Sequence, residues 1–71
     1  MDSATTPTGL DLKVERVSAR VKQQALALQM GVSASRVAAI EREAFPSTLI
    51  VYRYRSALAA CQNVSHAPEA A

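Results

Sequence analysis

Apolar residues recur at helical spacing in four segments of the chain, and polar or turn-forming residues separate these segments. The first segment opens at Thr8, which forms a possible capping box with Asp11 three residues later, and predicts a helix to about Arg20. One face of this helix carries apolar side chains, namely Leu10, Val14 and Val17, with Leu12 and Ala19 beside it.

Two shorter helices are predicted in the middle of the chain. The first runs from about Gln23 to Gln29 and turns three apolar side chains inward, those of Ala25, Leu26 and Met30. Gly31 ends it, because glycine tolerates the left-handed conformation that helix C-termini often need. Ser33 is a suitable N-cap for the next helix, which buries Val37 and Ile40 and runs to about Arg42 or Glu43.

A fourth helix is predicted after Pro46, which cannot continue the third. Ser47 is its expected N-cap, and it runs to about Gln62 with a recurring apolar set, Leu49, Ile50, Tyr54, Leu58 and Cys61. Residues 1–7 and 63–71 are polar, contain proline and lack periodicity, so we expect disordered tails around one domain at 8–62. The predicted fold class is all-α: a compact bundle of four short helices, or at most five.

Size and composition agree with a simple helical fold. The chain has 71 residues, of which 49% are hydrophobic but only 4% aromatic, and alanine supplies many of the apolar positions. Its net charge is +2. All eight basic residues but only four of the six acidic ones lie within 8–62, so the predicted domain carries +4. This excess modestly favours a nucleic-acid partner.

The sequence offers little for catalysis, metal binding or membranes. It has no glycine-rich phosphate loop and no paired cysteine and histidine, so we expect neither an enzyme nor a cofactor. His66 has no companion ligands, which argues against a metal site. Cys61 is the only cysteine and is expected to be a buried or half-buried apolar residue. With no apolar run near the N-terminus, we expect no membrane association and a cytoplasmic, nucleoid-associated location.

The second and third predicted helices are separated only by Gly31, Val32 and Ser33, and so short a turn sets two helices at a steep angle. The segment VKQQALALQMGVSASRVAAIER resembles the helix-turn-helix of the lambda repressor and Cro family, also called XRE-like. The resemblance covers about Leu10 to Cys61. The matching positions are Val21, Gln23, Leu26, Ala27, Gly31 to Ser33, Val37, Ile40 and Glu41.

This resemblance implies a compact lambda-repressor-like bundle whose helix at about 33–43 enters the major groove of double-stranded DNA. By position, the implied base-contacting residues are Ser33, Ala34, Ser35, Arg36 and Ala39. The implied phosphate contacts are Lys22, Gln23 and Arg42, helped by the amides at the start of the second helix. Arg16 and Glu41 match a pair that forms an internal salt bridge in the family. The chain departs from the family at Lys22, usually threonine or serine, and at Glu43, usually glycine or asparagine.

The expected function is therefore sequence-specific DNA binding by a transcriptional regulator, similar to a phage-type or small bacterial repressor. We expect a homodimer, at least on DNA, that reads two half-sites about one helical turn apart. One alternative is a protein-interaction role, such as an antitoxin or a subunit of a phage or plasmid complex, with a partner at the fourth helix or the C-terminal tail. Another is architectural DNA binding.

Overall fold

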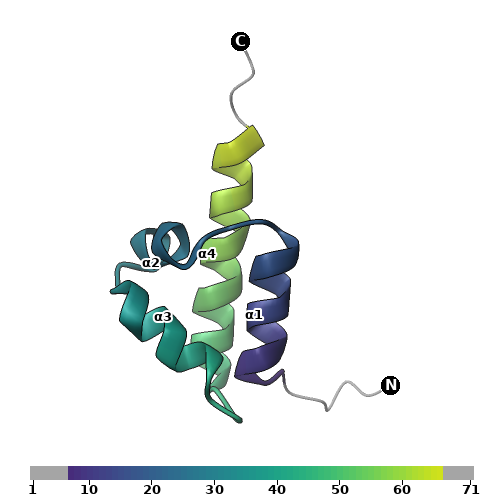
Figure 1. Ribbon diagram of the computed structural model, residues 1–71, viewed down its shortest axis with the longest axis vertical. Helices are drawn as coiled ribbons and strands as arrows, with labels where there is room; N and C mark the ends of the chain where they lie inside the picture. Colours follow the sequence, from purple (N-terminus) through teal and green to yellow (C-terminus); the bar gives the residue numbers. More distant parts are fainter. Residues whose placement is uncertain (1–6, 67–71) are drawn as a thin grey trace.

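The computed structural model describes the backbone of residues 7–66 and the side chains of residues 7–63. This part of the chain contains four α-helices and no strand: α1 (Gly9–Ser18), α2 (Gln23–Met30), α3 (Ala34–Glu41) and α4 (Thr48–His66). The predicted all-α class is thus confirmed, and the described residues form no fifth helix. Figure 1 shows α4 along the long axis, with α1 on one side and α2 and α3 on the other.

Helix α1 begins as predicted. The Thr8 amide donates to Asp11 Oδ2 at 3.0 Å, and the Asp11 amide donates to Thr8 Oγ1 at 3.1 Å, which completes a capping box. The helix ends at Ser18, two residues before the predicted end, because Arg20 adopts a left-handed conformation with φ 61°. Arginine rarely takes this conformation, so no stop signal of the usual kind marks this helix end in the sequence.

The apolar face predicted for α1 is exposed. Its three side chains, Leu10, Val14 and Val17, are 62%, 54% and 55% exposed. The helix instead buries Gly9, Leu12 and Arg16. This rotation follows from two contacts with α3: Gly9 packs against backbone atoms of Ile40 and Glu41, and Arg16 forms an ion pair with Glu41.

Helices α2 and α3 lie close to their predicted bounds. Leu26 and Ala27 are buried in α2, Met30 is half-buried, and Ala25 is exposed, contrary to its predicted inward position. In α3, Val37 and Ile40 are fully buried as expected. The error at Ala25 arises because the buried stripe of so short a helix spans only two residues, Leu26 and Ala27.

Helix α4 is longer than predicted. Ser47 Oγ accepts the Ile50 amide at 3.2 Å, as expected of a cap, but the helix continues to His66, beyond the predicted end at Gln62. Residues 63–66 are therefore helical, since neither proline nor glycine lies between Gln62 and Pro68. Leu49 is 57% exposed, contrary to prediction, and Val51 is buried in its place. The remaining predicted tail residues, 1–6 and 67–71, lie outside the described part of the chain.

The core forms where the four helices meet. Its fully buried side chains come from every helix and are Leu12, Leu26, Val37, Ile40 and Tyr54. Cys61 is buried as predicted. Helix α4 contacts α1 and α2, and α3 contacts α1 and α2, so the pair α2–α3 is supported from both sides.

Candidate nucleic-acid interface

The connection between α2 and α3 is a tight turn fixed by backbone geometry. Gly31 has φ 75°, and the Gly31 amide donates to the Leu28 carbonyl at 3.2 Å. The Val32 amide donates to the Ala27 carbonyl at 3.0 Å, which together with the first bond is a Schellman motif. This motif ends α2 sharply and lets α3 begin only four residues after α2 ends.

Ser33 starts α3. Its Oγ accepts the Arg36 amide at 3.1 Å and so satisfies one of the unpaired donors at the helix start. The hydroxyl oxygen of Ser33 is therefore used as an acceptor within the chain. Toward a partner, the hydroxyl can act chiefly as a hydrogen-bond donor.

The residues predicted to contact bases lie on the accessible side of α3. Four of the five, Ser33, Ser35, Arg36 and Ala39, are exposed, and Ala34 is half-buried. Because α3 buries the opposite residues Val37, Ile40 and Glu41, the accessible face is continuous along the helix. Arg36 carries the only long side chain with hydrogen-bond donors among the predicted base contacts.

The residues predicted to contact phosphates differ in their surroundings. Lys22 is the exposed N-cap residue of α2, and its side chain forms no capping hydrogen bond. Arg42 is exposed at the C-cap of α3. Gln23 is half-buried, and its Nε2 donates to Glu41 Oε1 at 3.0 Å. One amide hydrogen of Gln23 is thus already used inside the protein, and the sequence pattern does not predict this contact.

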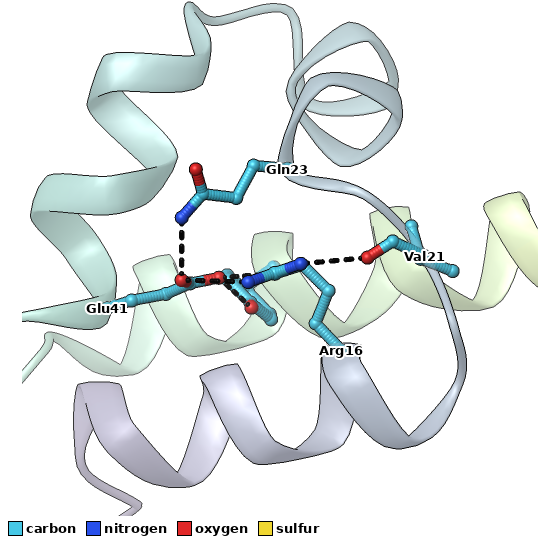
Figure 2. Close-up of polar contacts among 5 residues, drawn as sticks. Arg16, Val21, Gln23 and Glu41 are labelled. Carbon is cyan, nitrogen blue, oxygen red and sulfur yellow. Dashed lines mark hydrogen bonds and ion pairs between the residues drawn. The ribbon is translucent and has the colours of Figure 1, made fainter.

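Glu41 is the centre of a buried polar cluster that joins all four helices (Figure 2). Arg16 of α1 donates through Nε to Glu41 Oε2 at 2.7 Å, so the predicted Arg16–Glu41 pair is present. Tyr54 of α4 donates to the same oxygen at 2.6 Å, and Gln23 of α2 donates to Oε1. Arg16 Nη1 also donates to the Val21 carbonyl at 2.8 Å. The cluster therefore fixes α2 and α3 relative to α1 and α4.

Hydrogen bonding stabilises the charged forms of Arg16 and Glu41 in this cluster. Burial raises the pKa of the Glu41 carboxyl, but hydrogen bonds from Arg16, Tyr54 and Gln23 outweigh burial, and the net pKa lies below its ordinary value. The hydrogen bond to Glu41 raises the pKa of Arg16. Burial and the hydrogen bond to Glu41 raise the pKa of Tyr54, which stays a neutral donor.

The lowered pKa of Glu41 predicts that acid weakens the fold. In an unfolded chain a glutamate protonates near pH 4.3, and in the folded protein Glu41 does so at lower pH. Its stabilisation is therefore complete above the unfolded pKa and is lost as pH falls through the folded one. A carbon-13 NMR titration of the Glu41 carboxyl should give a midpoint below about 4.3. A midpoint at or above that value would contradict the prediction.

Two of the contacts to Glu41 were missed at the sequence level. The apolar periodicity predicts only a packing role for Tyr54, and the family resemblance implies a phosphate contact for Gln23. Both bonds join residues 13 or more positions apart on different helices. Helical periodicity places residues on a face but does not specify which polar groups meet across helices, so no local signal reveals these bonds.

The surface charge is unbalanced because three of the four acidic residues in the described part of the chain are engaged within the protein, while Glu43 forms no ion pair there. Asp11 caps α1, Glu41 is buried, and Glu15 pairs with Arg55 through a bond of 3.1 Å between Glu15 Oε1 and Arg55 Nε. By contrast, several exposed cations form no ion pair with any described residue: Lys13, Arg20, Lys22, Arg36, Arg42 and Arg53. Their charge remains available to an anionic partner.

Within the described residues, no group of three potential metal ligands gathers, and no helix is long and apolar enough to cross a membrane. Comparisons with family models, curated proteins and solved structures found no match to this chain.

Proposed function

We propose that this protein is a sequence-specific double-stranded DNA-binding transcriptional regulator in which α2, the turn at Gly31 and α3 form a helix-turn-helix. The observation that carries the proposal is the arrangement around α3. Its accessible face presents Ser35 and Arg36, and exposed, ion-pair-free Lys22 and Arg42 stand at the N-cap of α2 and the C-cap of α3. Long donors suit base edges, and flanking cations suit phosphates.

In this proposal α3 lies in the major groove and α2 crosses the DNA backbone. Direct readout is limited, because Ala34 and Ala39 offer only methyl groups to thymine. DNA shape then supplies part of the specificity. Two copies bind half-sites about one helical turn apart, which predicts a palindromic operator.

The first test is selection of bound sequences from random duplex DNA. Recovery of a palindromic consensus supports the dimeric regulator, whereas no enrichment of any sequence would contradict sequence-specific binding.

On the selected consensus, Arg36→Ala should weaken DNA binding by about 1 to 3 kcal/mol and relax the sequence preference at one base pair, because a bidentate contact to a base is lost. Unchanged affinity and consensus would reject Arg36 as a base contact.

Lys22→Ala is the matched comparison, since a phosphate contact carries no base identity. The variant should weaken operator and random DNA alike and lower the slope of log affinity against log salt by about one. A loss of affinity for the operator alone would show that Lys22 reads a base and does not contact a phosphate. Lys13→Ala, which removes an exposed cation on α1, controls for net charge in both experiments.

A protein-interaction role, such as that of an antitoxin or a complex subunit, is the second candidate. It is favoured by the exposed apolar stripe of Leu10, Val14 and Val17 on α1 and by Phe45, which is 87% exposed. Exposed apolar side chains that share one helix face are typical of binding surfaces. If the protein acts as a DNA-binding regulator, replacement of Val14 by lysine should leave operator binding intact. If it acts as an antitoxin, the same replacement should abolish its ability to neutralise a toxin.

A further inference from the structure

An open hollow of about 380 Å³ lies beside the proposed DNA surface. Its walls are the α1–α2 connection, the exposed face of α2 and one residue of α4. Apolar groups form much of the lining, contributed by Val21, Ala25, Leu28 and Cys61. The volume falls at the lower end of the range of roughly 300 to 1,000 Å³ that small-molecule sites occupy.

Two cations also line this hollow, Arg20 and Lys22. Both are exposed, and neither forms an ion pair within the described part of the chain. Arg20 has φ 61°, and this conformation is held by hydrogen bonds from the Arg20 amide to the Val17 carbonyl at 2.9 Å and from the Val21 amide to the Arg16 carbonyl at 3.2 Å. Glycine or asparagine would adopt it at lower cost. Arginine takes this conformation at a steric cost, and here it ends α1 beside the hollow.

The remaining lining is uncharged. Cys61 Sγ donates to the Ala25 carbonyl at 3.6 Å, and burial raises the pKa of the thiol, so it stays neutral. Leu28, which is 82% exposed, stands at the side of the hollow and has most of its surface available for contact. The site therefore combines two positive charges with a largely apolar wall, to which Gln29 adds one uncharged polar side chain.

We propose that this hollow binds a small amphiphilic anion, whose carboxylate or phosphate lies at Arg20 and Lys22 and whose aliphatic or aryl tail lies against Leu28 and Cys61. A second copy of the chain fits less well, because a symmetric contact here would bring like charges together. A bare phosphate backbone would leave Leu28 uncovered. Only an anion with an apolar tail matches both parts of the lining.

The test uses the full-length protein labelled with nitrogen-15 and the probe octanoate, followed by NMR. Octanoate should shift the amide signals of Val21, Ala25, Leu28 and Cys61 in a saturable way. Acetate has the charge without the tail, and 1-octanol has the tail without the charge, so both should bind at least tenfold more weakly. Equal binding by acetate would reduce the site to unspecific anion attraction, and no saturable shift with octanoate would overturn the proposal.

Two variants locate the head group. Arg20→Asn removes the charge while suiting the left-handed conformation, so it should fold at least as well as the parent chain. Arg20→Asn and Lys22→Gln should each weaken octanoate binding about two- to fivefold, as expected for exposed charge pairs. Lys13→Gln, on the outer face of α1 and outside the hollow, should have no effect. Equal losses in all three variants would overturn the assignment of the head group.

A consequence rests on the proposed function, because Lys22 would serve both the anion and a DNA phosphate. Octanoate should then weaken operator binding, and Arg20→Asn should reduce this competition while leaving operator affinity itself within about twofold of the parent. If octanoate binds without weakening operator binding, then Lys22 does not serve both ligands, but the anion site itself stands. If the protein binds no operator, the proposed function is contradicted, and the NMR titration with octanoate still tests the anion site independently.

Discussion

Replacement of Glu41 by alanine is expected to lower the free energy of unfolding by about 3 to 5 kcal/mol. The Glu41 side chain is only 3% exposed and accepts hydrogen bonds from Arg16, Gln23 and Tyr54. Its removal leaves the buried guanidinium of Arg16 without a counter-charge and the Tyr54 hydroxyl without an acceptor. Urea unfolding followed by circular dichroism measures the loss.

The Glu15–Arg55 pair provides the matched control. It is also a glutamate–arginine pair between helices, but its side chains are 36% and 48% exposed. Glu15→Ala should therefore cost no more than about 1 kcal/mol. A loss at Glu41 as small as that at Glu15 would show that the cluster contributes little to stability.

A double-mutant cycle separates the pair from its surroundings. Arg16→Met combined with Glu41→Leu removes both charges and keeps apolar volume, so the double change should cost clearly less than the two single changes added together. Strict additivity would mean that the two charges do not interact. Affinity for DNA should fall in these variants mainly through the folded fraction, because the surface residues of α3 are unchanged.

The fold could be predicted to the level of helices because its signals are local. Thr8 with Asp11, Gly31, Ser33 and Ser47 are caps that act on their own neighbours, and each of them does so in the structure. The end of α1 was placed two residues late because Arg20 supplies a left-handed residue where glycine is usual. The predicted end of α4 is too early because Asn63 and the polar residues after it resemble a tail, although neither proline nor glycine lies between Gln62 and Pro68.

The orientation of α1 could not be predicted because tertiary contacts override its apolar periodicity. The most hydrophobic stripe, Leu10, Val14 and Val17, lies outside, while Arg16 lies inside. The Arg16–Glu41 pair was reached through the family resemblance and not through periodicity, which treats an arginine as a surface residue. Tyr54 and Gln23 join this pair from helices that no sequence spacing connects to it.

The same packing explains why Gly9 is needed at the start of α1. Its amide donates to the Glu43 carbonyl at 2.8 Å, which draws the first turn of α1 onto the end of α3. A β-carbon at Gly9 would clash with the Ile40 carbonyl oxygen and would lie 2.7 Å from both the carbonyl carbon and the carbonyl oxygen of Glu41. These are backbone atoms, so a change of side-chain rotamer cannot relieve the overlap.

Gly9→Ala is therefore expected to destabilise the protein by about 3 kcal/mol or more, although alanine is the better helix former in isolation. Two variants control for other effects. Leu10→Ala changes the next residue, which is exposed, and should cost about 0.5 kcal/mol or less. Gly31→Ala meets no atom within 4 Å and should cost only the strain of its left-handed backbone, about 1 to 2 kcal/mol.

The clash at Gly9 also predicts a link to the buried cluster. Separation of α1 from the end of α3 would stretch the bonds from Arg16 to Glu41, so part of the loss in Gly9→Ala is the loss already caused by Glu41→Ala. The two changes combined should then cost less than their sum, measured by urea unfolding in an osmolyte that keeps the variants folded. If Gly9→Ala is neutral or stabilising, or if its cost adds fully to that of Glu41→Ala, then Gly9 does not hold α1 against α3 and some other contact sets the rotation of α1.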